Sequence, residues 1–461
     1  MATSNRKKAK RRKSSPKLPP ELRRVHLDAA GIDVGAESHW VAVPEGRDPE
    51  GRSVREFGAF TADLYALADW LATCGVTTVA MESTGVYWIP LFELLESQGF
   101  EVLLVNPRHL KSVPGRKTDV LDCRWLQRLH TYGLLQGSFR PEEQVCVLRA
   151  YLRQRQTLVR YAASHVQHMQ KALDQMNIKL HKVVSDITGV TGLRIIRAIL
   201  EGERDPRRLA QLRDPRCKNS EETIAKALEG TWREEHLFSL RQALTLYETY
   251  RAEIAACDQQ IQAHLGTFDS KDDDPPAART APRSRQNVGA ITFDVGSHLR
   301  RITGVDLTEI DGIDAVLALT IISEIGLDMN RWRTVKHFTS WLGLCPGSKI
   351  SGGKRLDSRT KPTSNRAAMA FRMAANALHR SDSALGAFLR RKKAHIGAPK
   401  AITATAHKLA RIVYTMLRHG RSYTDLGADY YEARYRGRVL NNLRRKANAL
   451  GYSLIENNNL D

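Results

Sequence analysis

Two aspartates stand three residues apart in the segment 117–126 (KTDVLDCRWL). On a helix, side chains three positions apart are surface neighbours, so Asp119 and Asp122 point the same way. The apolar residues that follow mark the other, buried side: Leu121, Trp125, Leu126 and Leu129. A hard divalent cation such as Mg2+ takes carboxylate oxygens of this kind. The simpler alternative is a solvated acidic first turn, which the helix dipole favours by itself.

Two further carboxylates follow predicted strands earlier in the chain. Asp33 comes directly after a strand at 26–32, and Glu82 directly after a buried strand at 76–81. In parallel α/β sheets, functional groups gather at the carboxyl ends of strands. Four acids brought together in this way cannot all stay ionised unless a metal neutralises them or their pKa values rise. We therefore predict that Asp33, Glu82, Asp119 and Asp122 form a catalytic site that holds Mg2+.

The elements that would position these acids alternate in a recognisable order. The apolar pattern predicts three strands, then helix, strand, helix, strand and the Asp119 helix, at 26–32, 40–43, 55–60, 64–72, 76–81, 86–97 and 101–105. This is the order of an α/β RNase H-like (RuvC-like) domain, which we place at residues 25–140.

A second candidate for chemistry is the loop 343–355 (GLCPGSKISGGKR). Glycine and proline force irregular backbone there, and glycine allows close approach to a phosphate. A serine in such a loop can attack a phosphodiester while nearby cations stabilise the charge on the phosphate. The alternative is a phosphate-binding loop without a covalent role. In either case we predict six nucleic-acid-binding residues: Lys349, Lys354, Arg355, Arg359, Lys361 and Arg366.

The charge of the chain is concentrated at its two ends. The net charge is +21 and the pI is near 9.8, with +9 in residues 1–24 and +16 in residues 341–461, which leaves −4 between them. This distribution is typical of a protein that binds a polyanion, and nucleic acid is the first expectation. The sequence has no membrane-length apolar run and no amphipathic basic helix with aromatic anchors, so we expect no membrane partner. Its six cysteines include no CxxC pair, which fits a reducing cytoplasm.

The rest of the chain divides by composition. Residues 1–24 predict a disordered basic arm, 141–265 a helical region, 266–288 a linker, 289–420 a mostly α-helical domain and 421–461 a loose polar tail. Two heptad seams in the helical region, broken once at Arg155, favour an antiparallel or intermolecular coiled coil, with an ordinary bundle as the alternative. The insert at 178–212 suggests no function. Segment 307–326 resembles a helix-hairpin-helix whose backbone N–H groups contact phosphate, or else is a plain helical hairpin.

Four motifs occur in order along the first domain: GIDVG (31–35), MESTGVYW (81–88), VNPR (105–108) and KTDVLD (117–122). Together with the serine loop they resemble the DEDD-type insertion-sequence transposases. This family is related to the Piv and MooV DNA invertases and includes bridge-RNA-guided serine recombinases. The resemblance covers about residues 25–419.

The resemblance implies a site-specific DNA recombinase of a mobile element, with residues 289–420 as its transposase domain. The family's Gly-Leu-x-Pro…Ser-Gly segment places the serine nucleophile on Ser351, with Ser348 as the fallback. It also implies a guide RNA, a homo-oligomer (dimer or tetramer) whose subunits share the reaction, and a cytoplasmic, nucleoid-associated bacterial protein. Two alternatives remain: a Holliday-junction-type metal-dependent nuclease, and a non-catalytic nucleic-acid-binding protein.

Overall fold

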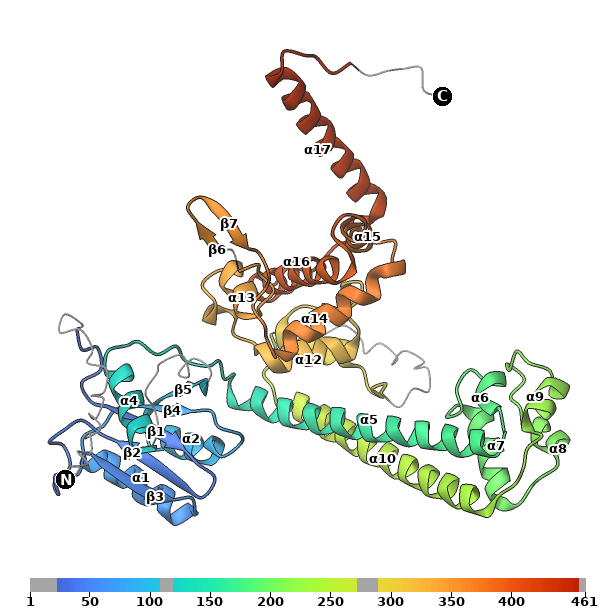
Figure 1. Cartoon of the computed structure of the whole chain (residues 1–461), viewed down its shortest axis with the longest axis horizontal. Helices are drawn as coiled ribbons and strands as arrows, with labels where there is room; N and C mark the ends of the chain where they lie inside the picture. The colour runs from blue at the N-terminus through green and yellow to red at the C-terminus, as the bar shows by residue number, and fades with distance from the viewer. Residues whose placement is uncertain (1–22, 108–118, 272–288, 348, 456–461) are drawn as a thin grey trace, which may run out of the picture. The chain divides into compact units, whose positions relative to one another are not determined.

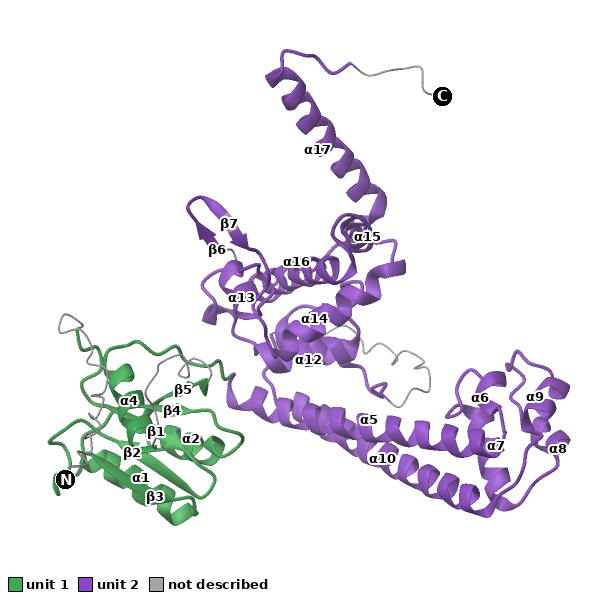
Figure 2. Ribbon diagram, viewed as in Figure 1, with its two compact units in different colours: residues 1–140 green, residues 141–461 purple. Residues whose placement is uncertain are grey.

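The structure is a computed structural model that describes residues 23–107, 119–271, 289–347 and 349–455. The chain forms two compact units, Met1–Arg140 and Pro141–Asp461 (Figure 2). Most of the predicted basic arm, most of the predicted linker and the fallback nucleophile Ser348 lie outside the described residues. Within the described residues, no helix is long and apolar enough to cross a membrane.

The first unit is built on a mixed five-stranded sheet in the order β3-β2-β1-β4-β5 (Figure 1). The central strand β1 pairs antiparallel with β2 and parallel with β4, and β4 pairs parallel with β5. The strands are β1 (Ala29–Val34), β2 (Ser38–Ala42), β3 (Val54–Gly58), β4 (Thr78–Glu82) and β5 (Glu101–Val105). The three helices described are α1 (Thr61–Thr73), α2 (Trp88–Ser97) and α4 (Asp119–Thr131).

Alternation along the strands assigns every side chain to one of two faces. On one face, Ile32 of β1 and Met81 of β4 join the helices α1 and α2 in the larger core of this unit. On the other face, Ala80 and Val105 pack with Leu126 of α4. The sheet is therefore covered on both sides, as the continuous apolar strands predict.

The second unit begins with two long helices, α5 (Glu143–Gln175) and α10 (Glu234–Gly266), which lie side by side in Figure 1. They run antiparallel, because Tyr161 meets Tyr250 near the middle of both helices while His264, near the end of α10, bonds the carbonyl of Gln144, near the start of α5. Four short helices cap the far end of this hairpin: α6 (Leu180–Val183), α7 (Val190–Glu201), α8 (Pro206–Gln211) and α9 (Glu221–Leu228). They share a continuous apolar core with the hairpin.

Arg155, the break in the predicted apolar seam, is buried in the hairpin with 3% of its surface exposed. Its guanidinium donates two hydrogen bonds to Asp258 of α10 and two to the carbonyls of Gly289 and Ala290. A buried charge is tolerated only when it is paired and fully hydrogen-bonded. Arg155, which interrupts the apolar pattern, therefore cross-links α5, α10 and the segment that follows the predicted linker.

The rest of the second unit is mostly helical, as predicted, with one small hairpin of strands β6 (Lys349–Ser351) and β7 (Lys354–Asp357). Three short 3-10 turns also occur, at Leu307–Glu309, Met329–Arg331 and Leu378–Arg380. The helices are α11 (Val295–Thr303), α12 (Ala315–Ile325), α13 (Val335–Trp341), α14 (Arg366–Ala377), α15 (Ala384–Ile396), α16 (Ala398–His419) and α17 (Gly427–Ala449).

The segment 307–326 consists of the 3-10 turn Leu307–Glu309, a turn at Gly312 and α12. Its turn glycine, Gly312, packs so closely on α14 that a Cβ atom would lie 2.5 Å from the carbonyl oxygen of Ala374. The start of α12 is capped by its own acid, because the Asp314 side chain accepts a hydrogen bond from Leu317 N–H. A phosphate would meet a carboxylate there, so the structure does not favour the DNA-contacting form.

The expectation of a loose tail at 421–461 is wrong for most of that segment. Residues 427–449 form α17, a helix of 23 residues in which no residue is buried. Its first turns pack on α15, where Tyr431 meets Phe388 edge-on. Polar composition suggested disorder, but the tyrosines give the helix an anchor that composition alone does not reveal.

Candidate functional site

The central strands bring two of the predicted acids to one edge of the sheet. Ile32 of β1 lies beside Met81 of β4 in the parallel register, so Asp33 and Glu82 come next on neighbouring strands, at their carboxyl ends. Since Ile32 and Met81 face α1 and α2, strand alternation turns Asp33 and Glu82 to the opposite face. Both side chains are partly exposed at that edge.

Helix α4 lies across this same face. Gly31, two residues before Asp33, permits the contact, because a Cβ atom there would lie 2.3 Å from the backbone nitrogen of Gln127 and 2.5 Å from the carbonyl oxygen of Cys123. Any other residue at position 31 would push the helix away from the sheet.

The direction of α4 places its first turn near the acids. Towards its end, His130 Nε2 lies 2.9 Å from the hydroxyl of Thr78, which begins β4, and Gln127 Nε2 donates to the carbonyl of Ala29, which begins β1. The helix therefore runs antiparallel to both strands. Its amino end, with Asp119 exposed and Asp122 half-buried, lies towards the edge where Asp33 and Glu82 stand.

The electrostatics of α4 agree with this arrangement. Burial raises the pKa of the Cys123 thiol to about 12, and the negative charge of Asp33 acts in the same direction. The thiol next in sequence to Asp122 thus lies within the field of the β1 acid. At the other end of the helix, burial lowers the pKa of His130 to about 4, with the stacked ring of His26 adding to the effect. The buried Cys123 and His130 of α4 are therefore uncharged near neutral pH, and the acidic side chains of the helix lie in its first turn.

The donor set fits a hard divalent cation in kind, since all four predicted ligands supply carboxylate oxygen. In the described part of the chain, however, no three His, Cys, Asp or Glu side chains lie close enough together to hold a metal ion. The backbone therefore brings the four acids from three segments to one region, while their side chains are not drawn into a compact ligand group. The segment that leads into Asp119, with Arg108 and Lys117 of the predicted motifs, lies outside the described residues.

The predicted nucleophile Ser351 stands at the tip of the β6–β7 hairpin. The two-residue turn after it, Gly352-Gly353, has φ values of 55° and 75°, which glycine adopts without strain and which the tightest hairpin turns require. Ser351 itself is exposed, and Ile350 and Leu356 of the same hairpin are 66% and 68% exposed. The serine is thus presented outward on a narrow apolar and basic projection rather than enclosed in a pocket.

The predicted nucleic-acid-binding cations surround this hairpin. Lys354, Arg359 and Lys361 are exposed. The backbone N–H of Arg359 donates to Asp357 and lowers the pKa of that carboxyl, and the Arg359 guanidinium, 3.2 Å from the same carboxylate, adds to the effect. Arg366 begins α14 and donates to Gln156 of α5. The side chains of Lys349 and Arg355 lie outside the described residues, although both backbones form part of the hairpin.

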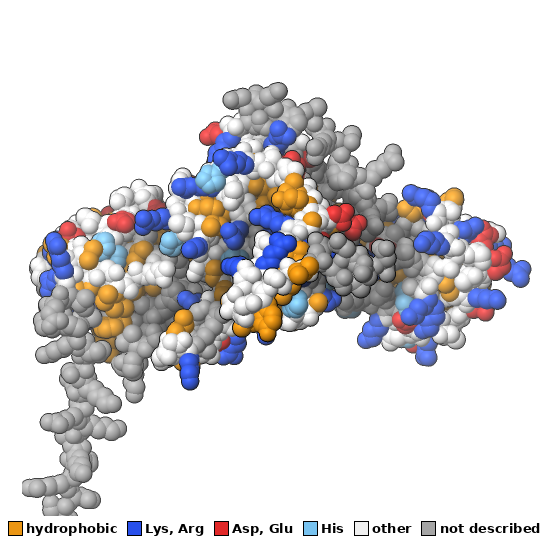
Figure 3. All heavy atoms as spheres, turned by 90° about the horizontal axis from the view of Figure 1, so that it is seen from above, with side chains coloured by type: hydrophobic (Ala, Val, Ile, Leu, Met, Phe, Trp, Pro, Cys, Tyr) orange, Lys and Arg blue, Asp and Glu red, His pale blue; other side chains and the backbone are white. Residues whose placement is uncertain are grey.

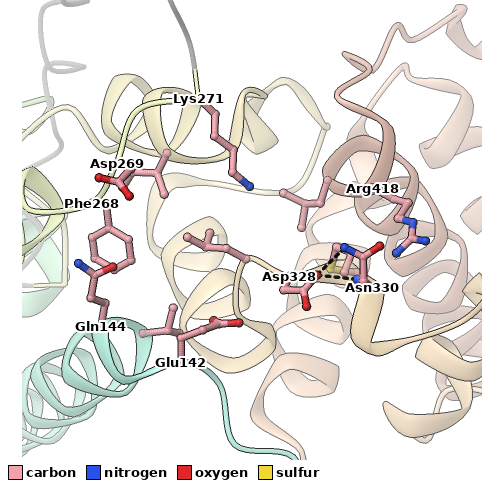
Figure 4. A pocket seen from close by; sticks show the side chains of 13 residues that line it. Glu142, Gln144, Phe268, Asp269, Lys271, Asp328, Asn330 and Arg418 are labelled. Atoms are coloured by element: carbon pink, nitrogen blue, oxygen red, sulfur yellow. Dashed lines mark hydrogen bonds between the residues drawn. The ribbon is translucent and has the colours of Figure 1, made fainter.

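A pocket of about 400 Å³ lies elsewhere in the second unit and contains none of the predicted site residues (Figure 4). Its wall carries charges of both signs, among them Lys271, Asp328 and Arg418. Asp328 accepts hydrogen bonds from the backbone and side chain of Asn330, and these bonds hold its pKa low. These contacts close a 3-10 turn, which gives Asp328 a structural role.

Sequence reasoning missed two contributors to these regions. Gly31 was part of a quoted motif, but its role as the contact point for α4 depends on a packing distance that no spacing rule gives. The helix α17 was missed because its apolar residues are few; the repeated tyrosines at positions 431 and 435 were the available signal.

Two family models match the chain. A DEDD transposase model of the IS110 type matches residues 30–178, which include Asp33, Glu82, Asp119 and Asp122. A model described as transposase IS116/IS110/IS902 family matches residues 306–390, which include Ser351 and the β6–β7 hairpin. A comparison with curated proteins finds no match. The first of these models indicates a divalent metal cofactor.

Proposed function

The chain belongs to the IS110 family of transposases, and from this premise we propose that it cuts and rejoins DNA at defined sites for an insertion sequence, using a carboxylate–metal site and a serine nucleophile. It is a DNA transposase, so a purely non-catalytic binding role no longer applies. One observation supports the proposal for the metal site: Asp33 and Glu82 follow paired residues of β1 and β4, and α4, which carries Asp119 and Asp122, packs on β1 at Gly31.

The strand order β3-β2-β1-β4-β5, with β2 antiparallel and the acids at the β1 and β4 ends, supports an RNase H-like (RuvC-like) assignment for the first unit. The paired helices α5 and α10 support a coiled coil within one chain, because their contacts run antiparallel over most of their length. The apolar seam of that pair is buried within the hairpin and its cap, so the intermolecular version of the prediction is the weaker one.

In the proposed mechanism, Asp33 and Glu82 of the sheet and Asp119 and Asp122 of α4 would hold the divalent ion. Mg2+ suits an all-carboxylate set that leaves room for water and phosphate oxygens. Such an ion polarises a phosphoryl oxygen and stabilises the leaving oxygen of the scissile phosphate. The exposed position of Asp119, at the first turn of α4, leaves that side chain room to move towards the other acids.

Ser351 supplies the covalent step of the proposal. Its Oγ attacks phosphorus, a bond between Oγ and phosphorus forms, and the bond from phosphorus to the leaving deoxyribose oxygen breaks, with the hydroxyl proton passing to that oxygen. A serine hydroxyl is a weak nucleophile at neutral pH and needs an activated phosphate. Because Ser351 lies exposed on a projecting hairpin, it is suited to attack a phosphate that is activated by the metal site of another unit or subunit. This is consistent with a dimer or tetramer in which subunits share each reaction.

The remaining parts of the proposal rest on the family. A guide RNA encoded by the element would select the target DNA, and Lys349, Lys354, Arg355, Arg359, Lys361 and Arg366 would hold nucleic acid beside Ser351. A protein with these partners acts at the bacterial nucleoid.

A second function, a Holliday-junction-type metal-dependent nuclease, is favoured by one specific observation. Among the described residues, no hydrogen bond or ion pair links the Ser351 side chain to a base that would activate it. In that case water attacks at the carboxylate site and the serine is incidental. The two functions differ in one product, because only the serine pathway leaves protein covalently attached to DNA.

The metal site is tested by Asp119→Asn with Asp69→Asn as the matched control. Asp69 is an exposed aspartate on α1, which packs on the opposite face of the sheet. We expect Asp119→Asn to abolish recombination and to weaken divalent-ion binding measured by calorimetry, while folding and DNA affinity stay unchanged. Asp69→Asn should behave as the unmodified protein in all four measurements. Normal recombination by Asp119→Asn in Mg2+ would show that the site is misassigned.

A further inference from the structure

Helix α17 is anchored at its beginning and uncovered along the rest of its length. Asp425 accepts hydrogen bonds from Gly427 N–H, which begins α17, and from Ala384 N–H, which begins α15. Arg391 of α15 forms an ion pair with Glu432 and stacks over the ring of Tyr435, 3.6 Å from its centroid. Beyond Tyr435 the helix extends away from α15 and α16 (Figure 1). No residue of α17 is buried.

The exposed part of α17 divides into two faces at helical spacing. On one face, Tyr431, Tyr435, Val439 and Leu443 recur every four residues, and the first two hold the helix to α15. An adjacent stripe carries Arg434, Arg438, Asn441 and Arg445 at intervals of four, three and four residues, with the Arg438 guanidinium 5.8 Å from the centroid of the Tyr435 ring. These four side chains are exposed and extend over about 16 Å of helix, at 1.5 Å per residue.

The positive charge on this face is not neutralised by carboxylates. Within the described residues, none of the three arginines forms an ion pair. Helix α17 has six Lys and Arg residues against Asp429 and Glu432, so its net charge is +4. The charge extends to α16, where burial lowers the pKa of Lys408, and Arg438 and Arg434 lower it further. Figure 3 shows blue Lys and Arg side chains beside orange hydrophobic ones on the face seen there.

Three occupants would suit an exposed, amphipathic, cationic helix: a second copy of α17, RNA or duplex DNA. A second copy packed in parallel would place Arg444, Arg445 and Lys446 against like charges, which disfavours that pairing. Duplex RNA has a deep, narrow major groove that protein side chains do not enter. The major groove of B-DNA admits an α-helix, and arginine and asparagine are both among the side chains that hydrogen-bond to base edges there.

We propose that α17 lies in the major groove of duplex DNA, with Arg434, Arg438 and Arg445 on the phosphates and Asn441 towards the base edges. This contact is separate from the serine hairpin and adds a second attachment to the DNA. It rests on the proposed function only in that the chain acts on duplex DNA. The Asp425 contacts and the Arg391–Tyr435 stack fix where the helix leaves α15, so they set the direction in which the DNA is held.

The test is a triple variant, Arg434→Gln/Arg438→Gln/Arg445→Gln, in the full chain. Affinity for a 30-base-pair DNA duplex is measured against salt, with a variant of equal charge change, Arg207→Gln/Lys218→Gln/Lys226→Gln, as the control. The control residues are exposed on the hairpin cap. Each lost phosphate contact lowers the log–log salt slope by about 0.9 on duplex DNA, so the α17 variant should lose between about 2 and 3 and the control none. An equal loss in both variants, or none in the α17 variant, overturns the proposal.

Three further measurements separate the alternatives. Arg→Lys at the same three positions should restore the salt slope, because a phosphate contact needs charge rather than a guanidinium. Dimethyl sulfate, which modifies guanine N7 in the major groove, should be blocked by the unmodified protein and less so by Asn441→Ala. Absent protection, a larger effect on duplex RNA than on DNA, or a change only in oligomeric state would each overturn the placement.

The Asp119→Asn variant keeps this result distinct from the proposed function. It should bind DNA with an unchanged salt slope although it does not recombine. If the α17 variant keeps its slope while Asp119→Asn is inactive, the transposase mechanism stands and the α17 contact falls. If Asp119→Asn recombines normally while the α17 variant loses its salt slope, the α17 contact is supported and the proposed carboxylate–metal site is wrong.

Discussion

Arg155 of α5 donates from Nε to Oδ1 of Asp258 of α10 at 2.5 Å, and only 3% of either side chain is exposed. The same guanidinium holds the carbonyls of Gly289 and Ala290, so one side chain joins three segments that are distant in sequence. An apolar pair would stabilise the two helices, but it would not fix the returning chain. We infer that this group sets the register of the α5–α10 hairpin.

Removing one member of this pair should strongly destabilise the second unit. Arg155→Leu leaves Asp258 buried without its partner, and breaking a buried pair in this way costs about 3–5 kcal/mol. The double variant Arg155→Leu/Asp258→Leu should recover much of that loss, because no uncompensated charge remains. Thermal and chemical unfolding of the full chain measures both, with Arg160→Leu, an exposed arginine on the same helix, as the control. A double variant no more stable than the single one would argue against the pair as the cause.

Gly31→Ala should abolish recombination while leaving the sheet folded. The added Cβ would lie within 2.8 Å of three backbone atoms of α4. Unlike a flexible side chain, these atoms cannot move without displacing the helix. The displaced helix carries Asp119 and Asp122, so divalent-ion affinity should fall together with activity. Calorimetric metal titration and circular dichroism check the two effects. Gly266→Ala, with open space around its Cβ position, should change neither.

The first unit should lose stability as the pH falls below about 6.5. His130 is buried, its folded pKa is lowered to about 4, and its unfolded value is the ordinary 6.5. Between these values the unfolded chain binds a proton that the folded chain does not, so folding stability is complete above pH 6.5 and declines towards pH 4. The loss is on the order of 3 kcal/mol at the lower limit. Unfolding measured at pH 8, 6 and 4.5 should show a smaller decline in His130→Gln than in the unmodified protein.

The covalent role of Ser351 can be separated from its position by mixing mutants. Ser351→Ala should form no protein–DNA adduct, and Ser358→Ala, an exposed serine just after the same hairpin, should form it normally. If subunits share each reaction, Ser351→Ala mixed with Glu82→Gln should regain activity that neither has alone. Oligomers shown to mix without regaining activity would place both groups in one subunit. An adduct formed by Ser351→Ala would instead support Ser348 as the nucleophile, whereas the absence of any adduct from the unmodified protein would support the nuclease alternative.

The sequence predicted those parts of the fold that follow from local periodicity. All five strands and their order along the chain were found, because each is a short apolar run ended by a turn, and Asp33 and Glu82 stand where the register puts them. The outcome of the serine loop was partly predicted: irregular backbone was expected, but the paired strands around Gly352-Gly353 were not. Three-dimensional contacts decided the rest. Nothing in the spacing of Gly312 shows that α14 covers it, and nothing in the composition of residues 421–461 shows that α15 anchors two tyrosines there.

The long hairpin begins and ends at one place, where His264 Nε2 lies 2.7 Å from the carbonyl oxygen of Gln144. The first turns of α5 also bond the flanking chain, because Arg149, Arg153 and Gln156 reach Ser323, Glu324 and Thr320. The Arg155–Asp258 pair lies about three turns from Gln144 along α5 and about two turns from His264 along α10, so the helices beyond it can lengthen or shorten by whole turns without altering the contacts at this end.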